Sequence, residues 1–174
     1  TTFDTIIDDH TYEDMDGNTT VITKAADRAA AVGILVCNSA GNEGDGSWYY
    51  IGAPADGDSV FTIGAVDING NSVSYSSHGP TFDGRLKPNV VGQGAGTGVV
   101  ASNGTVAYGN GTSYSSPLIA GACASFMSAF PELSNMEVMD IIQSTASQAD
   151  NPDNSMGYGI PNFAKAYLEL KGID

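Results

Sequence analysis

Basic residues are scarce in this sequence. It contains six lysines and arginines against 20 aspartates and glutamates, which gives a formal net charge of −14 over 174 residues. A surface of this sign repels the phosphates of nucleic acids and anionic lipids, so we expect neither as a partner. Long hydrophobic runs are absent as well, and no stretch approaches the roughly 20 apolar residues of a transmembrane helix.

Cysteine and histidine are rarer still, with two of each. Two cysteines do not form the framework of a disulfide-rich domain. Cys37 and Cys123 are each flanked by apolar residues, so we expect two buried free thiols. A reaction that needs a histidine from this chain can use only His10 or His78.

The length and the order of apolar segments predict one α/β domain. Three apolar runs are typical of buried parallel strands, at residues 34–37, 60–66 and 89–91. Four helices are expected: 20–32, a helix from Ser113 to about Ala129, one opened by the capping box of Ser134 and Glu137, and 163–170. Asn103-Gly104, between two short β-type segments, predicts a hairpin.

A turn of small residues precedes Ser113, and an apolar segment follows it. This pattern predicts a serine at the N-terminus of a buried helix, where free N–H groups and the helix dipole favour negative charge. The position suits a nucleophile whose attack creates an oxyanion. Pro117 is expected in the first turn, where its missing N–H costs little. Because serine is also a favoured N-cap residue, a structural role is the alternative.

A second loop of small residues follows the first predicted strand. Residues 40–44 read Ala-Gly-Asn-Glu-Gly, directly after the apolar run. An asparagine in such a loop is compatible with a left-handed turn. Its side-chain amide is also a hydrogen-bond donor, which gives Asn42 a second interpretation as part of a site.

These two segments together resemble the subtilisin-like serine proteases. Gly111-Thr112-Ser113-x-Ser-x-Pro-x-x-Ala-Gly is similar to the active-serine signature of that family, with Ser115 where the family often has alanine. Residues 40–44 match a second family segment without a gap. The resemblance implies a doubly wound, mostly parallel sheet with helices on both faces. It is clearest over residues 20–174, so residues 1–174 are interpreted as the C-terminal portion of a subtilase catalytic domain.

The resemblance also implies roles for individual residues. Ser113 would be the nucleophile, and the side-chain amide of Asn42 would donate to the oxyanion beside the Ser113 backbone N–H. The two walls of the primary specificity pocket would be formed by Ser39, Ala40 and Gly41 and by Gly52 and Ala53. Small residues there admit a large apolar side chain, and Glu43 would bias the rim towards basic residues.

A calcium site is implied by the resemblance but weakly supported by the residues. Its ligands would be carbonyl oxygens of Ala55, Gly57 and Val60, together with the residue that follows Lys87-Pro88. That residue is Asn89, which is neutral and a poorer ligand for a hard cation than aspartate. We therefore expect that no cofactor is required.

The base of a serine protease is missing from the sequence. Such an enzyme needs a histidine, oriented by an aspartate, to take the serine proton. His10 and His78 both lack the sequence setting that the family uses, so we expect the base and the aspartate to lie outside this chain. The strand expected beside residues 34–37 is absent too, which predicts an open sheet edge. The expected partner is the N-terminal half of the same domain, or a second copy.

Three functions from different classes compete at this stage. The first is a serine endopeptidase acting on peptides or proteins, which the family resemblance implies is secreted or held in the cell envelope. The second is an inactive subtilase-like fragment or pseudoprotease that binds peptides or partners. The third is a structural α/β domain with chance motifs. Retention of both Ser113 and Asn42 favours the first, because a binding module has no need of an oxyanion hole.

Overall fold

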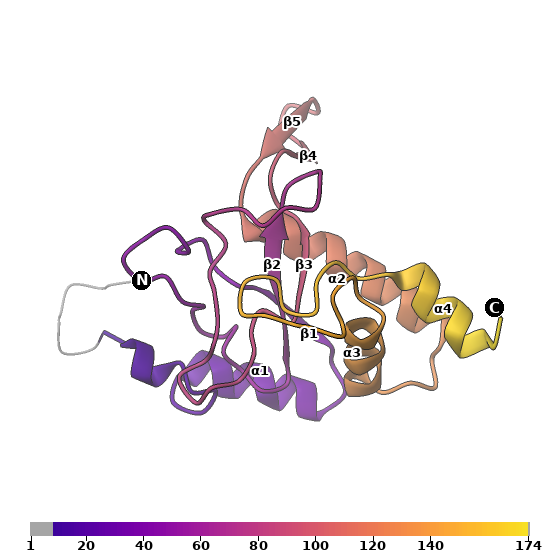
Figure 1. The fold of residues 1–174 in the computed structure, drawn as a ribbon, viewed down its shortest axis with the longest axis horizontal. Coiled ribbons are helices and arrows are strands. Elements are labelled where there is room, and N and C mark those ends of the chain that lie inside the picture. The colour runs from indigo at the N-terminus through magenta and orange to yellow at the C-terminus, as the bar shows by residue number, and fades with distance from the viewer. Residues whose placement is uncertain (1–8, 174) are drawn as a thin grey trace.

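A computed structural model describes residues 9–173, and it has a parallel sheet covered by helices (Figure 1). Within these residues the sheet has three strands in the order β1-β2-β3, with both pairs parallel. The elements in chain order are η1 (Tyr12–Asp14), α1 (Val21–Ala31), β1 (Val36–Ser39), β2 (Val60–Val66), β3 (Val90–Gln93), β4 (Thr97–Val100), β5 (Val106–Gly109), α2 (Thr112–Ala129), α3 (Asn135–Ser144) and α4 (Phe163–Lys171). The predicted α/β class is confirmed.

The central strand β2 is covered on both faces. All of its residues are buried, as expected for the interior strand of a parallel sheet. Phe61 and Ile63 point to one face and form the main apolar core with Ile119 and Phe126 of α2. Successive side chains alternate, so Val60 points to the other face, beside Gly57, where the Asp27 carboxylate of α1 also reaches. Helices therefore lie on both faces of the sheet, as predicted.

Helix ends follow the local sequence signals. The Thr20 side chain accepts a hydrogen bond from the first turn of α1, and Gly33, with φ of +93°, follows the end of that helix. The Ser134 and Glu137 capping box opens α3 as expected. One detail differs from the prediction. Pro117 is the sixth residue of α2 and not part of its first turn, so its missing N–H removes an internal helix bond.

The chain between β3 and α2 forms a hairpin that extends away from the sheet (Figure 1). Strands β4 and β5 pair antiparallel, with Val100 opposite Val106. Gly104 has φ of +81° in the connecting turn, which agrees with the predicted Asn-Gly hairpin. The side chains of Val100, Val106 and Tyr108 are exposed.

The two edges of the sheet differ. On the outer side of β3, the Val91 N–H donates to the Gly159 carbonyl and the Tyr158 N–H donates to the Asn89 carbonyl, so the C-terminal segment covers that edge. Strand β1 pairs with β2 alone among the described residues, and all four of its residues are only half-buried. The open edge predicted beside the first strand is present.

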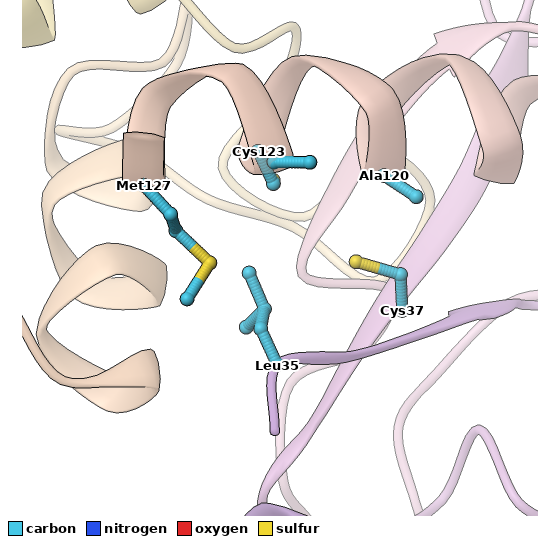
Figure 2. Close-up of a pocket in the computed structure, with 6 residues that line it drawn as sticks. Leu35, Cys37, Ala120, Cys123 and Met127 are labelled. Atoms are coloured by element: carbon cyan, nitrogen blue, oxygen red, sulfur yellow. The ribbon is translucent and has the colours of Figure 1, made fainter. Parts of the chain in front are cut away.

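An apolar groove of about 330 Å³ lies between β1 and α2. Figure 2 shows Leu35 and Cys37 pointing across it towards Cys123 and Met127. Both cysteines are free thiols, as expected. Cys123 is buried, but Cys37 is half-buried because its strand lies at the edge of the sheet. Among the residues that the structure describes, no helix is long and apolar enough to cross a membrane.

Candidate active site

The chain turns sharply at Gly111 to enter α2, and Ser113 lies in the first turn of that helix. Gly111 is the N-cap with φ of +143°, a conformation that favours glycine. A side chain at this position would also approach the Asn42 amide nitrogen to 3.4 Å. Ser113 is exposed. Its backbone N–H belongs to the first turn, which has no acceptor within the helix, so it points outward at the positive end of the helix dipole.

Asn42 is held against the start of α2 by one neighbouring residue. Its Oδ1 atom accepts hydrogen bonds from the Thr112 backbone N–H and the Thr112 hydroxyl, each at 2.9 Å. A backbone N–H can only donate, so the atom that receives it must be the amide oxygen. The Nδ2 group, with its two donors, takes no part in these bonds, and its nitrogen lies beside Gly111, two residues before Ser113.

The turn before the serine is fixed by Tyr75. The Tyr75 hydroxyl donates to the Gly94 carbonyl at 2.8 Å and accepts from the Gly111 N–H at 3.2 Å. The Gly111 N–H also donates to the Gly94 carbonyl at 2.8 Å. Burial raises the pKa of Tyr75, which keeps the hydroxyl protonated and able to donate. These bonds connect the end of β3 to the start of α2.

The residues expected to form the two pocket walls lie next to each other. The Gly52 N–H donates to the Ala40 carbonyl at 3.4 Å, which joins the 39–41 and 52–53 segments. Gly41 has φ of +113°, and a side chain on it would lie 2.7 Å from the Ser77 hydroxyl. The same hydroxyl accepts from the Glu43 N–H at 3.0 Å. Glu43 itself is exposed at the rim of this loop.

Neither histidine forms a hydrogen bond with Ser113 among the described residues. His10 is exposed in the segment before η1, with its Nδ1 3.2 Å from an Asp14 carboxylate oxygen. The His78 ring stacks on Tyr49, with ring centroids 4.6 Å apart, and its Nδ1 is buried without a hydrogen-bond partner. The expectation that neither is the base stays a prediction.

The carbonyl groups of the candidate calcium loop all interact within the chain. The Ala55 carbonyl accepts from the Thr62 hydroxyl at 2.6 Å, and the Gly57 carbonyl accepts from the Val60 N–H at 3.4 Å. The Val60 carbonyl accepts from the Lys87 ammonium at 2.6 Å.

Three supporting residues were missed at the level of sequence: Thr112, Tyr75 and Ser77. Thr112 lies inside the recognised serine motif, but no pattern assigns its hydroxyl to Asn42, 70 residues away. Tyr75 and Ser77 belong to the Tyr-Ser-Ser-His-Gly-Pro segment before β3. Their hydroxyls form hydrogen bonds with loops that are distant in the chain. The local periodicity of the sequence does not predict such long-range contacts.

Comparison with known proteins finds similarity to the subtilase family at the level of both sequence and structure. The model of the subtilase family matches residues 9–159. Subtilisin DY from Bacillus licheniformis is 40% identical over 141 residues, which cover 80% of this chain and 48% of that protein. Subtilisin E from Bacillus subtilis is 35% identical over 133 residues, which cover 76% of this chain and 33% of that protein. The chain thus spans about half or less of the length of these curated relatives.

Solved structures show the same fold. The self-cleaved protease domain of PatA aligns with a TM-score of 0.71 at 22% identity, covering 87% of this chain and 55% of that one. MycP1 from the ESX-1 type VII secretion system aligns with a TM-score of 0.69 at 22% identity, covering 86% of this chain and 46% of that one.

Proposed function

Because the chain belongs to the subtilase family, we propose that it supplies the nucleophile and the oxyanion hole of a serine endopeptidase. Ser113 Oγ attacks the carbonyl carbon of a peptide bond while a histidine takes its proton. The tetrahedral oxyanion accepts hydrogen bonds from Asn42 Nδ2 and the Ser113 backbone N–H. The same proton then goes to the leaving amine, which yields an acyl-enzyme on Ser113 that water hydrolyses.

The observation that carries the proposal is the pairing of Asn42 with Thr112. Two hydrogen bonds of 2.9 Å hold the amide oxygen, so Nδ2 has a fixed direction before any substrate arrives. Donors that are positioned in advance need no reorganisation during the reaction, which is the basis of oxyanion stabilisation. The alternative, in which Ser113 is a structural N-cap residue, does not fit the start of α2, because Gly111 occupies the N-cap position.

We further propose that the histidine and aspartate of the triad lie outside this chain. The family resemblance and the chain's share of its relatives support this, together with the surroundings of His10 and His78. The open edge of β1 is the natural contact for the N-terminal half of the domain. The substrate class is peptides or proteins, and a secreted or cell-envelope location agrees with the acidic composition.

Specificity in this proposal depends on the 39–41 and 52–53 segments. Their residues carry small side chains or none, which would leave room for a large side chain of the substrate to pack against the two hydrogen-bonded segments. Glu43, exposed at the rim, adds a negative charge that attracts lysine or arginine.

The test uses this chain combined with an N-terminal half of the catalytic domain that carries the histidine and aspartate. Asn42→Ala should lower peptide turnover by about 10²–10³, the loss known for this donor in subtilisin, with little change in KM. Asn18→Ala, at an exposed position before α1, is the matched control and should retain full turnover. An assembled protein that binds peptides without turnover would favour the binding-module alternative. Equal turnover of the Asn42 and Asn18 variants would contradict the proposed role of Asn42.

A further inference from the structure

Lys87 is a lysine whose ammonium group is buried inside the fold. Only 2% of the residue is exposed. Its Nζ donates to the Val60 carbonyl at 2.6 Å, to Asn89 Oδ1 at 3.0 Å and to the Thr62 hydroxyl at 3.2 Å. An ammonium has three donors and no acceptor, so these three oxygens match its hydrogen-bonding capacity. The group is a cation in a cradle of neutral oxygens.

This cradle coincides with the candidate calcium loop. Two of its oxygens, the Val60 carbonyl and Asn89 Oδ1, are ligands that the calcium site would need, and both are bound to the ammonium. The third oxygen of the cradle is the Thr62 hydroxyl. It contacts the same loop, because it also donates to the Ala55 carbonyl. Calcium requires six to eight oxygens at 2.3–2.6 Å, and it prefers charged ones. The residues present do not fit that ion.

We propose that the Lys87 ammonium is the resident cation of this site and takes the place of a metal ion. It joins β2, through Val60 and Thr62, to the start of β3, through Asn89. The Asn89 side chain then continues the network, because its Nδ2 donates to Gln143 of α3 at 2.8 Å. Folding of this region would therefore be independent of calcium.

The surrounding charges agree with a cation at this position. Asp56 is fully buried, with its carboxylate accepting from the Thr23 hydroxyl and the Gly17 N–H. Asp27, Asp56 and Asp58 all raise the pKa of Lys87, whereas burial and Arg85 lower it, and burial dominates to give a pKa of about 7.

A hollow of about 230 Å³ lies beside the cradle and is lined in part by Asp58, Asn89 and Gln143. A cation from solvent would have this route to the cradle if the lysine side chain were removed. The replacement of a metal ion by an ammonium can therefore be reversed experimentally.

The experiment compares thermal unfolding in EDTA and in excess calcium at about pH 6. The test variant is Lys87→Ala combined with Asn89→Asp, which opens the cradle and adds a charged ligand. Calcium at about 100-fold its Kd should raise the unfolding midpoint of this variant by about 5–10 °C. The parent should show no such shift. Asn89→Asp alone is the matched control, because it adds the same carboxylate but keeps the ammonium, and calcium should leave it unchanged.

The proposal is overturned if calcium raises the midpoint of the parent as much as that of the double variant. A second measurement needs no variant. In the parent labelled with ¹⁵N-lysine, the Lys87 Nζ hydrogens should exchange with water more slowly than those of exposed Lys24, and calcium should not alter their signal. Exchange as fast as at Lys24, or a shift of the Lys87 signal on adding calcium, would equally contradict it.

Discussion

The amide oxygen of Asn42 is bound twice by Thr112, through the backbone N–H and the hydroxyl, at 2.9 Å each. The Thr112 hydroxyl also accepts from the Gly41 N–H at 3.3 Å. One buried threonine thus connects the loop after β1 to the first turn of α2. The residue before Ser113, the proposed nucleophile, thereby sets the direction of the Asn42 amide.

Thr112→Val should lower the turnover of the assembled enzyme by about 2–10-fold, because it removes one hydrogen bond to Asn42 and keeps the backbone N–H. The effect should fall on kcat with KM nearly constant, since in the proposed mechanism the amide donor acts on the oxyanion and not on the ground state. Thr112→Ser retains the hydroxyl and should be close to the parent. Equal losses in the valine and serine variants would show that packing, and not the hydroxyl, is responsible.

Cys37 should react with iodoacetamide before Cys123. A hydrogen bond from Cys123 lowers the pKa of Cys37, while that bond and burial raise the pKa of Cys123. A lower pKa means more thiolate at a given pH, so alkylation of Cys37 should begin at lower pH. Mass spectrometry of each site against pH measures this.

Cys123→Ala removes the hydrogen bond and should move the alkylation profile of Cys37 to higher pH. Met127→Leu changes the lining of the same groove without touching the thiols and serves as the control. Identical profiles for Cys37 in the parent and in Cys123→Ala would refute the assigned cause.

The open edge of β1 and its apolar groove should make the isolated chain associate. Unpaired strand edges and apolar surface both favour pairing with another chain. Ala124→Lys places a charge on the groove side of α2 and should shift light scattering towards the monomer. Ala129→Lys, exposed at the end of the same helix and outside the groove lining, should not. A monomeric parent at high concentration would contradict this expectation.

Much of the fold could be predicted because its signals are local. Buried strands appear as apolar runs, and α3 begins at a capping box that two residues define. Asn42 could be expected near the start of α2 because Asn42 and Ser113 each lie in a compact motif of small residues, and the ends of neighbouring parallel elements meet at one side of a sheet. The structure brings Asn42 against Thr112, and the shared catalytic role of Asn42 and Ser113 stays a prediction.

What could not be predicted depends on contacts between distant residues. The role of Thr112 requires knowing that a hydroxyl meets a side chain 70 positions away. Lys87 appears in the sequence as an ordinary charged residue before a proline, and only the fold buries it against Val60. The position of Pro117 was misjudged because α2 begins at Thr112, which sequence alone does not fix to within a turn.

The most direct measurement is labelling of Ser113 by a fluorophosphonate probe, with the chain alone and after addition of an N-terminal half that carries the histidine and aspartate. A serine hydroxyl is a weak nucleophile until a base takes its proton, so the account predicts labelling of Ser113 only in the mixture. Ser115→Ala, in the same turn, should leave that labelling intact, whereas Ser113→Ala should abolish it. Rapid labelling of the isolated chain, together with peptide cleavage, would contradict the account and assign the base to His10 or His78.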